Sequence, residues 1–178
     1  MNAITLLTND HRTVEGLLER YRSATVEAKQ SLLDEITREL MKHMDAEENV
    51  LYPQLRTSIH DGVKLMAEAV DEHEKAKGLL SELQNAEAGS FEMDSRISTL
   101  QKAIAHHVRE EEGNIFPEMQ KSLDAARLEQ LGGQIEEAKR SAPETPPPSA
   151  EEDSPGVSVA GVVTAAGDRL KDAVRGKE

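Results

Sequence analysis

Two stretches of the chain, HMDAEENVLYP at residues 43–53 and HVREEEGNIFP at residues 107–117, follow the same pattern. Each begins with a histidine, places a glutamate four residues later (Glu47 and Glu111), and closes with two apolar residues and a proline. A helix turns about 100° per residue, so a histidine and a glutamate at this spacing lie on one face, about 6 Å apart along the axis. Such a pair can bind one ion from one side, and its recurrence predicts a site with two equivalent halves.

Apolar residues and histidines recur at intervals of three or four residues in four segments, which predicts four helices. Breaks fall at residues 23–25, 58–62 and 85–90, and these short joins predict an all-α, antiparallel up-and-down four-helix bundle. A further short helix is predicted over residues 124–139, at one end of the bundle. The four inward-facing stripes are Ile4, Leu7, His11, Val14, Leu18 and Tyr21; Ile36, Leu40, His43, Glu47, Val50 and Gln54; Val63, Met66, Val70, His73, Lys77 and Leu80; and Ile97, Leu100, Ile104, His107, Glu111 and Ile115.

The repeat extends beyond the two opening stretches. DHRTVEGLL at residues 10–18 resembles EHEKAKGLL at residues 72–80, so each half of the chain contributes a second histidine. His11 precedes His43 by 32 residues, and His73 precedes His107 by 34. The bundle is therefore predicted to be one helical hairpin used twice, which brings four histidines and two glutamates to one level of the core.

Composition restricts the kind of protein and the kind of site. Hydrophobic residues make up 37% of the chain but include two Phe, two Tyr and no Trp, which predicts an aliphatic core. The absence of cysteine excludes thiolate metal sites and disulfides. A net charge of −13 argues against a nucleic-acid partner. With no basic leader at the amino terminus and no run of 18 apolar residues, the expected protein has no transmembrane segment and is cytoplasmic.

Imidazole and carboxylate together are the ligands that iron, zinc and manganese accept, and bridging carboxylates suit a pair of such ions. A single histidine on an apolar stripe is more often an ordinary core residue, and a single glutamate is more often solvated. Four of the six histidines, however, lie on stripes that face inward. Burying them beside glutamates without a metal would leave unpaired polar and charged groups in the core, so metal binding is predicted.

Several residues near these positions allow two interpretations of their role. His60 and His106 are predicted to lie at the surface. Glu48 and Glu112 are either acceptors for imidazole N–H groups or solvated charges. Tyr52, whose repeat partner is Phe116, is either a core residue or a donor to the metal or to a metal-bound oxygen, which makes it the candidate catalytic residue. Pro53 and Pro117 are expected to kink or end their helices.

At these positions the chain resembles the hemerythrin-like family, the HHE cation-binding domain. The resemblance covers roughly residues 3–135 and rests on the ordered set His, His-x-x-x-Glu, His, His-x-x-x-Glu, with a proline six residues after each glutamate. It implies two non-haem iron ions with an oxo or hydroxo bridge inside a four-helix bundle. The ligands implied by the match are His11, His43, Glu47, His73, His107 and Glu111.

The chain also departs from the oxygen-carrying members, which have His-x-x-x-His on the third helix and His-x-x-x-x-Asp on the fourth. Here Lys77 replaces the histidine, and the fourth helix has His-x-x-x-Glu. One fewer imidazole makes a harder site, which disfavours reversible oxygen storage. The resemblance then favours reaction with peroxide, oxygen or nitric oxide, in a protective or catalase-like role under oxidative stress.

The alternative function is a non-catalytic oxygen or iron sensor, or an iron-handling binding module, built on the same site. Ferritin-like bundles use Glu-x-x-His pairs, so the spacing here disfavours them. The ligand is expected to reach the site through an apolar shell of Leu7, Val14, Leu40, Val70, Ile104 and Val108.

The composition changes near residue 141, where five prolines fall within residues 143–155. We therefore expect residues 1–140 to form the domain and residues 141–178 to form a Pro-rich acidic linker with a short C-terminal amphipathic segment. This tail is expected to be disordered and is the candidate binding segment for an unidentified protein partner.

Overall fold

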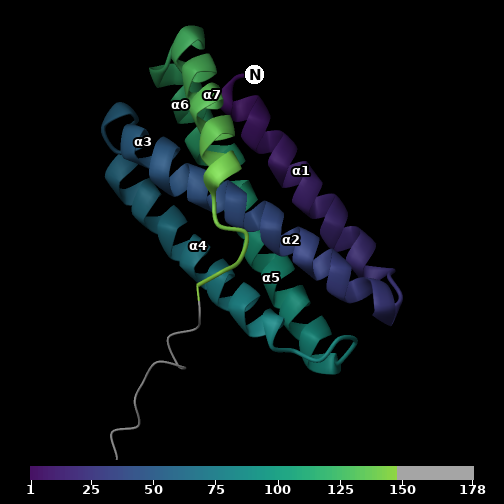
Figure 1. Ribbon diagram of the computed structural model, residues 1–178. Coiled ribbons are helices and arrows are strands. Elements are labelled where there is room, and N and C mark those ends of the chain that lie inside the picture. The colour runs from purple at the N-terminus through teal and green to yellow at the C-terminus, as the bar shows by residue number, and fades with distance from the viewer. Residues whose placement is uncertain (148–178) are drawn as a thin grey trace, which may run out of the picture. The chain divides into compact units, whose positions relative to one another are not determined.

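The computed structural model describes residues 1–147, and within this range the chain is helical and has no strand. Figure 1 shows α1 antiparallel to α2 and α4 antiparallel to α5, with α3, α6 and α7 toward one end of the bundle. The predicted all-α four-helix bundle with a short extra helix is confirmed. The predicted disordered tail begins at residue 141, so its residues 141–147 are described and its residues 148–178 lie outside the described part. The bounds are α1 Ala3–Arg22, α2 Val26–Ala46, α3 Tyr52–Ser58, α4 Gly62–Gln84, α5 Phe91–Glu110, α6 Phe116–Ser122 and α7 Ala125–Ser141.

Polar side chains fix the starts of three helices. The side chains of Asn2, Ser90 and Asp124 accept hydrogen bonds from the backbone N–H three residues later, at 2.9, 3.1 and 2.8 Å. Each bond satisfies a donor that has no partner inside its helix. These caps set the starts of α1, α5 and α7, and thereby the height at which the side chains of each helix meet the core.

The aliphatic core consists of two clusters. One includes Leu18, Leu33 and Leu100, and the other includes Leu7 and Met119 at the end of the bundle where α3, α6 and α7 lie. The buried histidines and glutamates belong to neither cluster. Apolar packing therefore surrounds a polar layer, and the helices that supply the apolar residues also hold the polar ones.

Two π-helical segments connect the long helices to their short extensions. Glu47–Leu51 joins α2 to α3, and Glu111–Ile115 joins α5 to α6. In each, the backbone N–H of the residue before proline donates to the carbonyl five residues back, that of Glu47 or Glu111. Proline has no N–H and its ring clashes with the carbonyl four residues back, so a wider turn lets the helix pass it. Pro53 and Pro117 therefore do not end their helices.

Two of the predicted stripes contain an exposed residue, Gln54 in the second and Val63 in the third. Met66, His73 and Leu80 of α4 are buried, but Val63 is 68% exposed because it lies in the first turn of α4, at the edge of the bundle. Periodicity alone does not show where a helix emerges from its neighbours.

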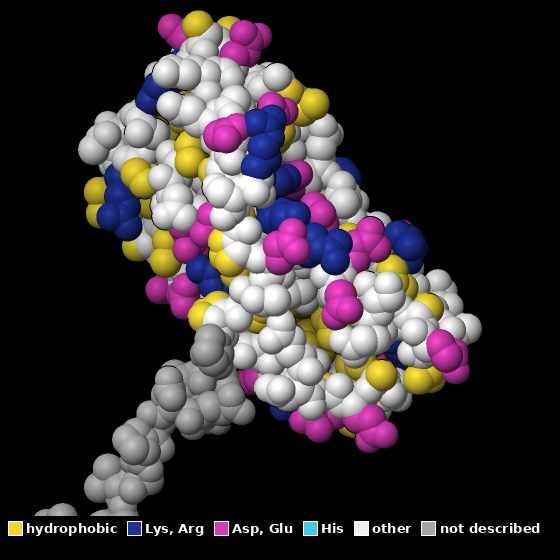
Figure 2. All heavy atoms as spheres, viewed as in Figure 1, with side chains coloured by type: hydrophobic (Ala, Val, Ile, Leu, Met, Phe, Trp, Pro, Cys, Tyr) yellow, Lys and Arg dark blue, Asp and Glu magenta, His cyan; other side chains and the backbone are white. Residues whose placement is uncertain are grey.

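Helix α7 packs on α1, α2 and the π segment Glu47–Leu51. At Gly132 the helix comes so close to the amino terminus that a Cβ would meet the carbonyl oxygen of Met1 at 2.1 Å. Just past the predicted domain boundary, Pro146 is buried and Glu144 pairs with Lys42 at 2.9 Å. Figure 2 shows this side of the molecule, where acidic and basic side chains are interspersed. None of the helices in residues 1–147 combines the length and hydropathy needed to cross a bilayer.

Two adjacent glycines of α7 provide a matched test of this packing. Gly132→Ala should lower the free energy of unfolding by about 1–3 kcal/mol, because its methyl group overlaps the amino-terminal backbone. At Gly133 an added methyl group would meet open space. Gly133→Ala should therefore raise the free energy of unfolding by roughly 0.5–1 kcal/mol, because alanine has the higher helix propensity. Urea denaturation measures both. Equal effects from the two variants would contradict the close approach of α7.

Candidate metal centre

The structure brings all six residues of the ordered sequence set into one layer. Each residue is at most 5% exposed, and both glutamates are fully buried. One histidine comes from each long helix, and each glutamate begins a π segment, as follows: His11 from α1, His43 from α2, His73 from α4, His107 from α5, and Glu47 and Glu111 from the π segments.

Each histidine binds a carboxylate from a neighbouring helix through Nδ1. A carboxylate acceptor fixes the ring orientation and leaves Nε2 directed at the centre of the layer. The pairs follow the chain in a closed ring, because each long helix or its π extension supplies the acceptor for the next helix, and the last supplies the first. The Nδ1-to-oxygen distances are 3.5 Å for His43 and Asp10, 2.8 Å for His73 and Glu48, 3.0 Å for His107 and Glu72, and 2.8 Å for His11 and Glu112.

A further basic side chain contacts each of these four carboxylates. Three are lysine or arginine, which carry a charge at neutral pH, and the fourth is an imidazole. The charge on Asp10, Glu48 and Glu112 is thereby compensated from outside, which keeps these three acceptors ionised and in place. The contacts are Lys139 to Asp10 at 2.5 Å, Lys77 to Glu48 at 2.8 Å, Arg12 to Glu112 at 2.7 Å and His106 to Glu72 at 3.2 Å.

On the inner side, the two buried glutamates lie between two pairs of histidines. The ring centroids of His11 and His43 are 4.9 Å apart, and those of His73 and His107 are 4.7 Å apart. Glu47 Oε2 lies 3.2 Å from His43 Nε2 and 3.3 Å from His73 Nε2, so it spans both pairs. Glu111 Oε2 likewise lies 3.1 Å from His11 Nε2 and 3.8 Å from His107 Nε2.

Five inner atoms are buried and have no hydrogen-bond partner: Nε2 of His11, Nε2 of His43, Oε1 of Glu47 and both carboxylate oxygens of Glu111. Burying such atoms without a partner is costly, and a cation between them satisfies all of them at once. Two groups have ligand atoms within 4.8 Å of one another and can hold an ion: His11, His43, His107 and Glu111; and Glu47, His73 and His107. The donor set therefore fits a pair of metal ions.

The protonation of the layer depends on its two carboxylates. Burial alone would raise the pKa of Glu47, but His43 and His73 together outweigh burial and hold this pKa well below its usual range. Burial and the negative charge of Glu47 raise the pKa of Glu111. Burial favours the neutral form of His43, but Glu47 and Asp10 outweigh it and raise its pKa to about 10. Without metal, protons therefore supply the positive charge that the carboxylates require.

Tyr52 and Phe116 occupy equivalent positions but differ in chemistry. Phe116 stacks on His11 with ring centroids 6.0 Å apart, and Tyr52 stacks on His73 with centroids 5.5 Å apart. The Tyr52 hydroxyl donates to Glu47 Oε2 at 3.2 Å and lies 3.2 Å from His73 Nε2. Burial, followed by the charge of Glu47, raises the pKa of this phenol well above its usual value, so it retains its proton.

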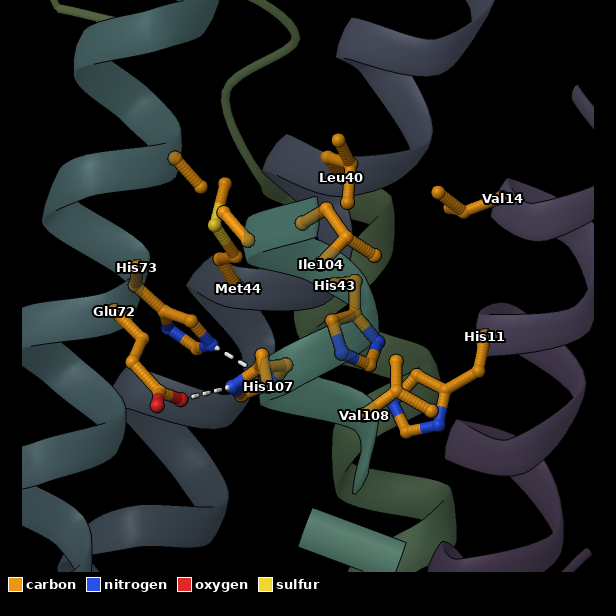
Figure 3. A pocket seen from close by; sticks show the side chains of 12 residues that line it. His11, Val14, Leu40, His43, Met44, Glu72, His73, Ile104, His107 and Val108 are labelled. Carbon is orange, nitrogen blue, oxygen red and sulfur yellow. Dashed lines mark hydrogen bonds and ion pairs between the residues drawn. The ribbon is translucent and has the colours of Figure 1, made fainter. Parts of the chain in front are cut away.

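A small apolar cavity of about 20 Å³ lies against the histidines, with room for one water-sized molecule. Figure 3 shows the four histidines along one side of it and Val14, Leu40 and Ile104 on the other. Val14, Leu40, Ile104 and Val108 of the expected apolar shell line this cavity. Leu7 and Val70 do not, because they pack in the second apolar cluster.

The remaining sequence candidates are placed as follows. Glu48 and Glu112 are acceptors for imidazole and not merely solvated charges. His60 and His106 are exposed, as predicted. Sequence reasoning missed Asp10 and Glu72 as acceptors, although each directly precedes a stripe histidine in the repeat. That acidic-His dipeptide was the available signal, but its partner lies on another helix.

Metal binding should release protons from this layer. In the metal-free protein His43 holds a proton up to about pH 10, and Nε2 must lose it before it can bind a metal. Titration with Co²⁺ in weak buffer should therefore release at least one proton, and apparent affinity should rise about tenfold per pH unit for each proton released. A pH indicator and binding isotherms measure both. Asp10→Asn should shift the pH dependence of the Co²⁺ affinity to lower pH, because Asp10 raises the pKa of His43. Co²⁺ binding without proton release would contradict the prediction.

Known proteins are similar to this chain in sequence and in fold. Residues 2–119 match the family described as Hemerythrin HHE cation binding domain. An uncharacterized hemerythrin-like protein of Schizosaccharomyces pombe is 27% identical over 165 residues, which cover 92% of this chain and 81% of that protein. A Nostoc protein named DNA nickase is 29% identical over 140 residues, 78% of this chain but 39% of that protein.

The crystal structure of a hemerythrin HHE cation-binding domain-containing protein from Mycobacterium kansasii superposes with a TM-score of 0.68 at 27% identity, over 79% of this chain and 89% of that one. The fold, the layer of histidines and glutamates and the family match agree. The chain belongs to the hemerythrin HHE cation-binding domain family.

Proposed function

We propose that this hemerythrin-like metal-binding domain holds two non-haem iron ions and reacts with small oxidants, hydrogen peroxide foremost. The proposed ligands are His11, His43, Glu47, His73, His107 and Glu111. The observation that carries the proposal is the set of buried Nε2 and carboxylate atoms that face one another without hydrogen-bond partners. Nitrogen and oxygen donors in this ratio suit iron, and the carboxylates between the histidine pairs suit two ions rather than one.

Peroxide fits the surroundings of the site. The cavity beside the histidines is small and lined mainly by apolar side chains, which favours a small neutral molecule over a charged one. In a catalase-like reaction two molecules of hydrogen peroxide give two of water and one of dioxygen, so no other reductant is consumed. A pair of iron ions would supply and recover the two electrons that pass between the peroxide molecules.

The chain's own residues manage position and protons around that chemistry. The carboxylates on Nδ1 hold each imidazole in one orientation. Tyr52 keeps a proton on its hydroxyl within hydrogen-bonding distance of Glu47, and it is the buried O–H group that can donate on this side of the layer. Lys77, which stands where the oxygen carriers have a histidine, donates to Glu48 and contributes no ligand to the layer.

The same site also supports an alternative, a non-catalytic oxygen or iron sensor or an iron-handling module. A scavenger turns over many peroxide molecules, whereas a sensor changes state once. The nicking activity in the name of the Nostoc relative is not proposed, because this chain spans 39% of that protein and has a net charge of −13.

The metal content of two adjacent histidine variants tests the ligand set. His107→Ala should lose most bound iron, because His107 belongs to both groups that can hold an ion. His106→Ala should keep about two irons per chain, because its imidazole is exposed and contacts Glu72. Elemental analysis of protein purified from iron-replete cells measures both. Metal loss from His106→Ala with retention by His107→Ala would show that the wrong histidine had been assigned.

An oxygen electrode tests the reaction. Fully iron-loaded protein should release dioxygen from hydrogen peroxide over many turnovers, and His73→Ala, which removes a proposed ligand, should lose nearly all of this activity. His60→Ala is the control, because His60 is an exposed residue in the turn between α3 and α4. This variant should match the unaltered protein. If loaded protein evolves no more oxygen than His73→Ala, the scavenger function fails and the sensor remains.

A further inference from the structure

A second hollow reaches the metal layer from outside the bundle. It is a partly open groove of about 270 Å³ between α4 and the α5 end that continues into the π segment Glu111–Ile115. Leu65, Ala69 and Ile115 contribute its apolar surface, and His107 and Glu111 of the buried layer are among its lining residues. The groove therefore connects solvent with two of the proposed ligands.

The groove is lined by acids. Glu68 and Glu72 are four residues apart on one face of α4, and Glu110 comes from α5, so three carboxylates precede Glu111. No lysine or arginine is among its lining residues. Lys64 approaches Glu68 only to 3.8 Å, with both side chains more than half exposed, and Glu110 accepts a hydrogen bond from the neutral amide of Asn114 at 2.6 Å. The outer part of the groove thus keeps a negative potential that attracts cations.

A buried, unpartnered group lies where the groove meets the layer. Glu111 is fully buried, lines the groove, and has no hydrogen-bond partner for either carboxylate oxygen. Glu72, next to it in the groove, is occupied by His106 at 3.2 Å and His107 at 3.0 Å. Glu111 Oε2 lies 3.1 Å from His11 Nε2, whereas Oε1 makes no polar contact within residues 1–147, so Glu111 has an oxygen available to a hydrated cation as it exchanges water for protein ligands.

The other half of the repeat lacks this opening. By the spacing of the ligand histidines, Glu68 corresponds to Leu6, Glu110 to Ala46 and His106 to Lys42. Leu6 and Ala46 are buried, and α7 packs over α1, α2 and the π segment there. The two halves share their ligands but differ in access. The first half is apolar and covered, and the second is acidic and open.

We infer that the groove lined by Glu68, Glu72 and Glu110 is the port through which divalent cations enter and leave the centre, with Glu111 the first ligand they meet. This inference rests on the proposed metal-binding role of the layer. A cation cannot cross the apolar clusters on either side of the layer without losing its hydration uncompensated. The groove offers oxygen ligands along the way and space for the water that the cation still carries.

The test separates the rate of metal uptake from its extent. Metal-free protein is mixed with Co²⁺ in a stopped-flow spectrometer, and the visible absorption of the bound ion is followed. Glu68→Gln/Glu110→Gln removes two charges of the port but no proposed ligand. Glu129→Gln/Glu136→Gln removes two charges from the exposed side of α7, over the closed half, and is the matched control.

The port variant should take up Co²⁺ about tenfold more slowly than the unaltered protein, and should release it to a chelator more slowly by the same factor. Its final metal content, affinity and melting temperature should not change. Its uptake should also depend less on salt, because part of the attraction is gone. The α7 control should behave like the unaltered protein.

Three outcomes would contradict the account, and they can be told apart. If the port variant takes up Co²⁺ at the unaltered rate and reaches the normal final metal content, the groove is not the entry port, and the proposed metal centre is unaffected. Slower uptake accompanied by weaker binding would also overturn it, because Glu68 and Glu110 would then act as ligands. If the unaltered protein takes up no Co²⁺, iron or other divalent metal at all, the proposed function itself fails.

Discussion

The structure depends on one constraint, which is that six ionisable side chains must be buried together in an aliphatic core. Four histidines and two glutamates, each buried, lie between two clusters that consist mainly of leucine, isoleucine, valine and methionine. The chain satisfies the outer face of this layer with its own hydrogen bonds and leaves part of the inner face without partners. Protons balance the charge in the metal-free state, and the arrangement of the free ligand atoms favours cations in their place.

The hydrogen bonds on the outer face of the layer explain how the four long helices are held together. Each histidine binds a carboxylate of a neighbouring helix, so the four long helices are linked in a ring through the layer itself. The acceptors are in turn held by basic groups outside, such as Lys139 of α7 on Asp10. A helix that shifts along its neighbour breaks one of these bonds, and the layer therefore fixes the register of the helices as well as the ligand positions.

The duplicated hairpin gives the two halves of the domain equivalent ligands. The two halves differ in the residues that surround these ligands. The phenol of Tyr52 has only the ring of Phe116 as its counterpart, so a proton donor is present on one side of the layer. The first half is covered by α7, whereas the second half keeps an acidic groove down to Glu111. The apolar cavity lies against the histidines and is separate from the acidic groove, so under the two proposals neutral ligands and cations would use different spaces in the same domain.

Much of this could be predicted from sequence because it depends on local spacing. The intervals of three and four residues predicted the helices, and the repeat predicted that four histidines and two glutamates would meet at one level. What could not be predicted depends on contacts between distant segments. The acceptor roles of Asp10 and Glu72 require knowledge of which helix is adjacent, and the exposure of Val63 reflects where α4 leaves the bundle. The π turns arise from the way proline is accommodated, and the closed and open halves depend on where α7 packs.

Anomalous diffraction from crystals of the iron-loaded protein, recorded at the iron absorption edge, tests the central claim most directly. Two peaks are expected within the buried layer, on the Nε2 side of the imidazoles and between Glu47 and Glu111. One should lie beside His11 and His43 and the other beside His73 and His107. A single peak, or peaks outside the layer, would contradict a two-ion centre built from these residues.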